Sequence, residues 1–222
     1  MKAFLKSKNG KRATIITLLV LIIAAFALYM HNADENLLNH KVDSAVTMNS
    51  TKNTLKEDDI RPFTRSDLLR NRKKALQLGV DKYPNGYLII PAIGIKLPIY
   101  NRANNYTLSL GVGKSYYLDS QFGKGNFVVA GHDMEIPGVL LSDLHNVRLG
   151  EQVILTGYNG QQYKYRVTSK KVVPPTVKIV DGKPIAGSAF YMPQNNEKPI
   201  VTVYTCANGG INRLVVQGEL EN

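Results

Sequence analysis

The residues with the clearest chemical potential lie near the end of this 222-residue chain, where its only cysteine, Cys206, ends one apolar run and Arg213 begins the next. Both runs are rich in β-branched residues, and a turn cluster, Ala207 to Gly210, separates them. This pattern predicts a hairpin over 199–217 with the thiol and the guanidinium on neighbouring strand ends. A single cysteine forms no disulfide within its own chain, so it is inert, intermolecular or a reactive nucleophile. Free cysteines are usually buried and inert, so Cys206 alone does not decide between these roles.

A reactive cysteine needs a partner that stabilises the thiolate and passes a proton to a leaving group, and histidine is the usual one. Two of the four histidines lie in the second half of the chain. His132 follows the apolar run 126–131 and is expected at the rim where a strand ends. His145 lies in a polar turn. A histidine in a loop is more often structural than catalytic, and the rim position favours only His132.

Strand signals dominate the chain from Gly86 onward. Short apolar or alternating runs, separated by Gly, Pro and Asn, lie at 87–90, 95–100, 126–131, 152–156, 161–173, 200–206 and 214–220. Asn159-Gly160 is a strong hairpin signal between two of them. Many short strands with turn signals predict an all-β, mainly antiparallel barrel or sandwich. One amphipathic helix over 66–78, capped by Ser66, is expected to pack on this body.

The N-terminal part of the chain predicts a membrane anchor. Residues 14–30 are apolar and uncharged, and basic residues precede them in 1–13, so the positive-inside tendency keeps the N-terminus cytoplasmic and exports the rest. A cleaved signal peptide is the alternative, but the apolar run is long for one. Residues 31–60 are polar without periodicity and predict a flexible extracellular linker. Residues 61–222 then form the folded domain.

Charge limits the possible partners. The formal net charge is +11, but five basic residues precede the apolar segment, and the rest of the chain is only mildly basic. No concentrated basic run argues for nucleic acid, and a mildly basic domain suits an anionic cell envelope.

The motifs around these residues resemble those of the sortases, the cysteine transpeptidases of Gram-positive cell surfaces. The family pattern is TLxTC, an arginine on the following strand, and a histidine that closes an earlier strand. The corresponding residues are TVYTC (202–206), Arg213 and AGH (130–132). The resemblance covers roughly 68–220 and, with the N-terminal anchor, points to the class A, or housekeeping, group. It implies a closed sortase-type β-barrel of about eight strands with an N-terminal helix and short helical turns.

The resemblance also implies a reaction. Cys206 would attack the threonine carbonyl of an LPxTG-type signal on a surface protein and hold that protein as a thioester. A peptidoglycan-precursor amine (lipid II) would then accept it. His132 as imidazolium would protonate the leaving amine, and Arg213 would bind the oxyanion or the substrate backbone. Ala130, Tyr204 and Thr205 would contact the substrate, although packing within the strand is an equal alternative for Thr205.

Three alternative functions compete with this one. Pilin-type sortases usually have a lid, which Arg61-Pro62-Phe63 weakly resembles, and a C-terminal membrane helix, for which no apolar tail is present. An L,D-transpeptidase would need a Ser-x-Gly-Cys setting, which the chain lacks. A non-catalytic tethered barrel would contain an inert Cys206.

The calcium-binding members of the sortase family place several acidic residues on the loop before the histidine strand. This chain has only Asp119 there, so no metal and no cofactor is expected.

Overall fold

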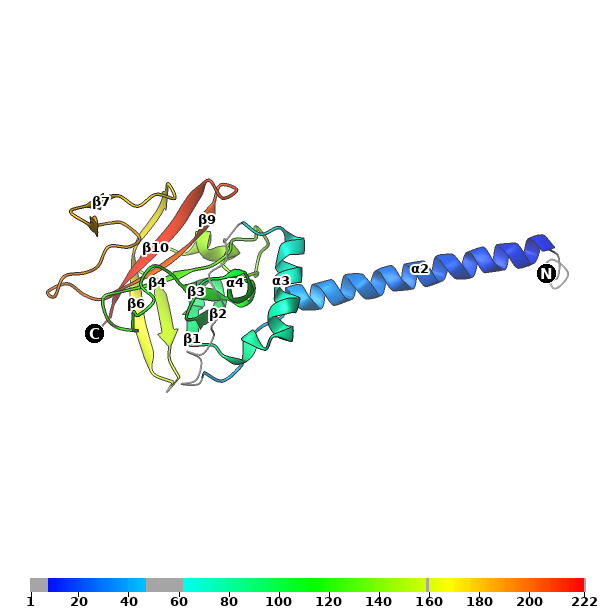
Figure 1. The fold of residues 1–222 in the computed structure, drawn as a ribbon, viewed down its shortest axis with the longest axis horizontal. Helices are drawn as coiled ribbons and strands as arrows, with labels where there is room; N and C mark the ends of the chain where they lie inside the picture. Colours follow the sequence, from blue (N-terminus) through cyan, green and yellow to red (C-terminus); the bar gives the residue numbers. More distant parts are fainter. Residues whose placement is uncertain (1–7, 47–61, 159, 222) are drawn as a thin grey trace. The chain divides into compact units, whose positions relative to one another are not determined.

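The computed structural model describes residues 8–46, 62–158 and 160–221 in two compact units, 1–40 and 41–222. Helix α2 (Lys8–Leu38) forms the first unit, and within it Lys11–Leu38 is long and apolar enough to cross a membrane (Figure 1). The helix continues past Met30, where the sequence predicts the start of the linker. Residues 31–38 contain Ala, Glu and Leu and no Gly or Pro, so they favour the helix that they extend.

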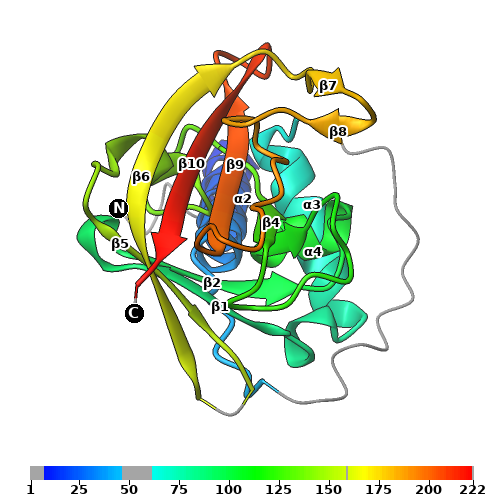
Figure 2. The same ribbon diagram turned by 90° about the vertical axis from the view of Figure 1, so that its left-hand side faces the viewer.

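The second unit is built on a closed eight-stranded barrel, which confirms the predicted fold. Its strand order is β1-β2-β3-β4-β9-β10-β6-β5, with parallel pairing only at β2–β3 and β4–β9. Figure 2 shows β6, β10, β9 and β4 side by side. The bounds are β1 Gly86–Ile90, β2 Ile95–Tyr100, β3 Val112–Lys114, β4 Asn126–Ala130, β5 Gln152–Thr156, β6 Gln162–Val173, β9 Ile200–Ala207 and β10 Asn212–Leu220.

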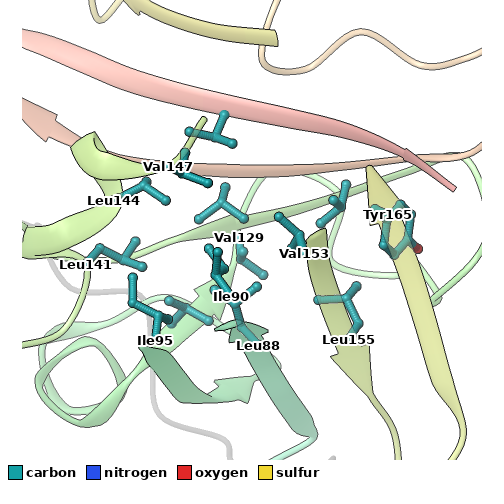
Figure 3. Close-up of a cluster of buried hydrophobic side chains, with 14 of the residues drawn as sticks. Leu88, Ile90, Ile95, Val129, Leu141, Leu144, Val147, Val153, Leu155 and Tyr165 are labelled. Carbon is teal, nitrogen blue, oxygen red and sulfur yellow. The ribbon is translucent and has the colours of Figure 1, made fainter. Parts of the chain in front are cut away.

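The side chains of alternate strand residues point inward and fill the barrel. In β5, buried residues alternate with half-buried ones, as period-2 geometry requires when one face meets the core. The side chains that meet inside the barrel include Leu88, Ile90, Val129, Val153, Leu155 and Tyr165 (Figure 3). All five residues of β4 are buried, so its outer face is covered as well as its inner one. This strand leads directly to His132.

The helices of the barrel unit are short; α3 and η2 precede β1, and the others lie between strands. Helix α3 (Arg65–Gln77) begins one residue before the predicted start, and its N-cap is Thr64 and not Ser66. The Thr64 hydroxyl accepts the Asp67 N–H, and the Asp67 carboxylate accepts the Thr64 N–H, which is a capping box. The other short helices are η2 Val80–Lys82, η3 Pro91–Ile93, α4 Asn105–Leu110 and η4 Ser142–Asn146.

Residues 41–46 pack on the barrel unit, although the sequence predicts that they belong to a flexible linker. Val42 is buried in a cluster with Tyr100 and other apolar side chains. The Tyr87 hydroxyl donates to the Ser44 carbonyl at 2.7 Å. The folded unit therefore begins near residue 41 and not at 61, and residues 47–61 of the predicted linker lie outside the described residues.

Two further features depart from the sequence-based expectation. Strand β3 closes the barrel between β2 and β4 but contains only three residues, one of them Gly113, so it has no alternating signal. Within the connection 174–199, β7 (Ile179–Val180) and β8 (Lys183–Pro184) form a two-stranded hairpin. Pro184 is tolerated there because a two-stranded ribbon consists only of edge strands.

Candidate active site

Strands β9 and β10 place Cys206 directly opposite Arg213. The two residues are partners in the antiparallel register, so their side chains leave the same face of the ribbon. Directly opposite Cβ atoms in such a pair are about 4.5–5.5 Å apart. Both residues are partly buried. The predicted hairpin is therefore confirmed, and it brings the thiol and the guanidinium together at one end of the barrel.

Strand β4 carries His132 to the same end. It runs parallel to β9 with Ala130 opposite Tyr204, and the Gly131 N–H donates to the Tyr204 carbonyl at 3.2 Å. His132 lies two residues beyond Ala130, and Cys206 lies two residues beyond Tyr204. Because the two parallel segments have a similar rise per residue, two further residues bring each of them to the same edge of the barrel. The pairing therefore brings His132 to the edge that holds Cys206.

The three predicted substrate contacts differ in position. Tyr204 lies on the face that carries Cys206, and its hydroxyl forms a 2.7 Å hydrogen bond with the Ser115 hydroxyl. Ala130, its partner on β4, is buried. Thr205 is 1% exposed, and its hydroxyl donates to the Gly131 carbonyl at 2.8 Å. Its side chain therefore joins β9 to the segment that bears His132, as the packing alternative describes.

His132 is covered rather than open to solvent. Its side chain is 3% exposed, and among the described residues Nε2 has no hydrogen-bond partner. The ring of Phe63 stacks on it with a centroid distance of 3.9 Å. Burial lowers the pKa of His132 to about 4. The imidazole is therefore neutral at pH 7 in this structure, in contrast to the imidazolium that the sequence analysis expects.

The segment that covers His132 also reaches the β9–β10 turn. Pro62 lies 3.1 Å from the position that a Cβ on Gly210 would occupy, so the two residues are in close contact. Pro62 and Phe63 thus lie over two of the elements that build the site. They belong to the lid-like sequence noted above, whose Arg61 lies outside the described residues.

Removing the Phe63 ring should raise the pKa of His132. In Phe63→Ala, water reaches the imidazole and the desolvation that lowers its pKa is relieved, so the value should move from about 4 toward 6.5. An NMR titration of the His132 ring protons measures this directly. An unchanged His132 curve would mean that Phe63 is not the group that desolvates it.

The second histidine has a local role. The Nδ1 atom of His145 lies 2.7 Å from the Ser142 carbonyl in η4, and the His145 carbonyl accepts a hydrogen bond from Lys170. These contacts bind the turn to itself and to β6. Neither of them reaches the β9–β10 hairpin, so the preference for His132 agrees with the geometry.

A cavity of about 440 Å³ lies on the outer face of β9 and β10, the face that carries Tyr204 and Arg213. Tyr204, Arg213, Val215 and Gln217 contribute to it from β9 and β10. The connection after β6 contributes the opposite wall through residues 174–178 and 185–190. The cavity therefore reaches Arg213, the register partner of Cys206.

Hydrogen bonds hold part of that wall in place, and the sequence analysis did not identify the residues responsible. The Asn126 amide donates to the carbonyls of Ala189 and Tyr191, at 3.0 and 2.8 Å. The Gln217 amide donates to the Ser188 carbonyl at 3.0 Å. Asn126 and Gln217 look like strand residues in the sequence, and only the outward direction of their side chains reveals this function. Residues 188–191 are thus a preformed wall.

Arg213 has no acidic partner among the described residues. Its Nη1 donates to the carbonyls of Gly210 and Asn212, at 2.8 and 2.9 Å, which holds the turn after Cys206 in place. No described carboxylate forms an ion pair with it. Its remaining donors can therefore bind a carbonyl or an oxyanion that enters the cavity.

Several known proteins are similar to this chain in sequence and in fold. The family model of the sortase domain matches residues 88–221, more than half of the chain. Sortase A of Bacillus anthracis is 28% identical over 137 residues, which cover 61% of this chain and 59% of that protein. Sortase A of Streptococcus agalactiae serotype III is 26% identical over 223 residues, covering 93% and 83%. The chain thus spans about three fifths of the Bacillus relative.

Solved structures show the same fold in more than one sortase class. Sortase A of Listeria monocytogenes superposes with a TM-score of 0.53 at 26% identity and covers 63% of this chain and 88% of that one. Sortase C2 of pilus island 1 from group B Streptococcus gives a TM-score of 0.53 at 22% identity, covering 86% and 94%. At that identity the second likeness concerns the fold alone.

Proposed function

The chain belongs to the sortase family, and we propose that it is a membrane-anchored cysteine transpeptidase of the class A kind. It would cleave an LPxTG-type sorting signal between Thr and Gly and transfer the protein to an amine of the peptidoglycan precursor. The observation that carries this proposal is the pairing of Cys206 with Arg213 at the rim that His132 also reaches, beside a cavity.

Each of the three residues has a distinct task in this reaction. Cys206 Sγ attacks the threonine carbonyl, and Arg213 donates hydrogen bonds to the oxygen that becomes negative. The C–N bond to glycine breaks, and His132 gives a proton to the departing amine. The thioester keeps the acyl group reactive until a second amine attacks and loses its proton to His132. Expulsion of the Cys206 sulfur then completes the transfer.

The neutral state of His132 suits the first step. A neutral imidazole accepts the proton of the Cys206 thiol as the sulfur attacks, and it becomes the imidazolium that the leaving amine requires. The cover over the ring must move before substrate binds, because Phe63 stacks on the imidazole. Pro62 and Phe63 therefore act as a removable cover in this proposal.

We infer that the activity needs no calcium. The Lys114 ammonium is buried and donates to the Ser120 carbonyl at 2.8 Å, so it already supplies a cation inside the loop before β4. Burial lowers the pKa of Lys114, and nearby Asp119 partly opposes this shift. Glu197, on the connection before β9, already accepts a hydrogen bond from the Tyr191 hydroxyl. Within the described ranges, no three His, Cys, Asp or Glu residues gather as metal ligands.

Helix α2 supports a location at the membrane. Its apolar stretch is long enough to cross a bilayer, and basic residues precede it. We propose a single-pass protein with a cytoplasmic N-terminus and an extracellular catalytic unit. Its partners would then be surface proteins that carry the sorting signal and the lipid-linked cell-wall precursor.

One observation favours a second candidate function. A lid is a feature of the pilin-type group in the resemblance described above, and Pro62 and Phe63 of the lid-like sequence lie over His132 and the β9–β10 turn here. In that case the acceptor would be a lysine side chain of another surface subunit, and the product would be a polymer. The chemistry at Cys206 would be the same, so the acceptor amine distinguishes the two functions.

The proposed function predicts both cleavage and transfer by the full chain in detergent. A fluorescence-quenched LPxTG peptide should be cleaved between Thr and Gly in the presence of a chelator, and adding calcium should not change the rate. Mass spectrometry should detect the new amide when an amine is added. A small peptide amine that resembles the cell-wall precursor should compete better than a lysine side-chain amine. The reverse preference would support the pilin-type function, and no cleavage at all would refute both.

A further inference from the structure

The cavity beside β9 and β10 is lined by cations and by no anion. Lys171, Lys178 and Arg213 contribute positive charge, and its other lining residues are apolar or uncharged. In the part of the chain that the structure describes, none of these three cations has a carboxylate within ion-pair distance. Unpaired cations around one cavity make its electrostatic potential more positive and favour an anionic ligand.

Lys171 is the cation whose position is best defined. It pairs with Val215 across β6 and β10, and two residues further along Val173 pairs with Arg213. Residues two apart on a strand share a face, so Lys171 and Arg213 project to the same side. The Lys171 ammonium lies 3.7 Å from the position that a Cβ on Gly187 would occupy. It therefore spans the cavity from β6 to the opposite wall.

Lys171 is close enough to Arg213 for one extended peptide to reach both residues. Strand residues advance about 3.3 Å each, so Lys171 lies roughly 7 Å along the strand from the level of Arg213. A peptide whose scissile carbonyl lies at Arg213 has its preceding residue about 3.3 Å further on. A glutamate side chain at that residue and the long side chain of Lys171 cover the remaining gap.

We propose that the preferred sorting signal carries a carboxylate at its variable position, immediately before the scissile threonine, and that Lys171 determines this preference. The proposal rests on the proposed function and specifies which peptides the same cavity accepts. Lys178 on the loop adds to the attraction, whereas Arg213 remains committed to the scissile carbonyl.

The expected preference is moderate and sensitive to salt. Because Lys171 is largely exposed, a single pair with it should favour the acidic peptide only about fivefold in kcat/KM at low ionic strength. Mobile ions screen such a pair, so the preference should fall toward parity as salt is added. A preference that came from shape alone would not respond to salt.

A competition experiment tests the proposal. The full chain in detergent is given two peptides at once, identical except for Glu or Gln at the variable position, and the two products are measured in the same reaction. The parent should favour the Glu peptide. Lys171→Met should lose most of that preference, so that the Glu and Gln products form in a ratio close to one. Lys164→Met is the matched control on β6, because Lys164 pairs with Ile154 on β5, away from the cavity.

The outcomes separate this inference from the function on which it rests. Equal cleavage of the two peptides by the parent, or an unchanged ratio in Lys171→Met, would overturn the inference and leave the transpeptidase function intact. An equal loss of preference in Lys164→Met would also overturn it, because net charge and not the cavity would then be responsible. If the parent cleaved neither peptide, the proposed function would itself be wrong.

Discussion

Replacing Cys206 with alanine should abolish peptide cleavage and transfer and leave the fold unchanged. Every step of the proposed reaction passes through a bond to the Cys206 sulfur, and the described residues at this rim offer no second thiol. Cys206 is only partly buried at the end of β9, so losing one sulfur atom removes little core packing. The loss of activity should therefore be complete and the loss of stability small.

The measurement pairs turnover with a test of folding. Turnover of the quenched peptide should fall to background in Cys206→Ala, and the thermal unfolding midpoint and circular dichroism should match those of the parent. The parent should form an acyl-enzyme that mass spectrometry detects and that hydroxylamine releases, whereas the variant should form none. Retained cleavage by a pure, folded variant would remove Cys206 from the mechanism.

The strongest sequence signals concern the elements around the site. The β-branched runs on both sides of Ala207 to Gly210 predict the hairpin, and the register places Cys206 opposite Arg213. The apolar run before His132 becomes β4, which is buried on both faces. These signals are local, because a strand's own residues record which of its faces are buried. The closed barrel was implied by the family resemblance and not by these patterns, which allow a sandwich equally.

Other features of the fold and the site depend on contacts that the local sequence pattern does not record. Strand β3 is too short to alternate, and its place in the barrel depends on the neighbours that it pairs with. The ring that stacks on His132 belongs to Phe63, which is 69 residues away in the chain. Val42 looks like an isolated apolar residue in a polar segment, and only the cluster beneath it explains its burial. In each case the determining contact is distant in sequence.

The fixed and the exposed parts of the cavity wall suggest how the site works. Asn126 and Gln217 bind residues 188–191, so this part can be ready before substrate arrives. The β7–β8 hairpin exposes Ile179 and Val180 instead. In the proposed reaction the cover formed by Pro62 and Phe63 moves before substrate binds, while the anchored residues 188–191 can stay in place.

Replacing His132 with alanine should lower cleavage by roughly 10²- to 10⁴-fold, the usual contribution of a general acid–base. The leaving amine is a poor leaving group without a proton, and in the proposed mechanism His132 is the residue that delivers it. His145→Ala is the matched control. It should stay within a few-fold of the parent, because the contacts of His145 hold only its own turn and β6.

The dependence of kcat/KM on pH distinguishes catalysis by His132 from a purely structural role. His132 accepts the Cys206 proton only when it is neutral, and burial lowers its pKa to about 4 in the free enzyme. The acidic limb of the parent should therefore lie well below pH 6.5, with activity lost as pH falls through that limb. Phe63→Ala should move the limb upward, His145→Ala should keep it, and His132→Ala should lack it. If His145→Ala were inactive and His132→Ala active, the assignment of His132 as the histidine beside Cys206 would be wrong.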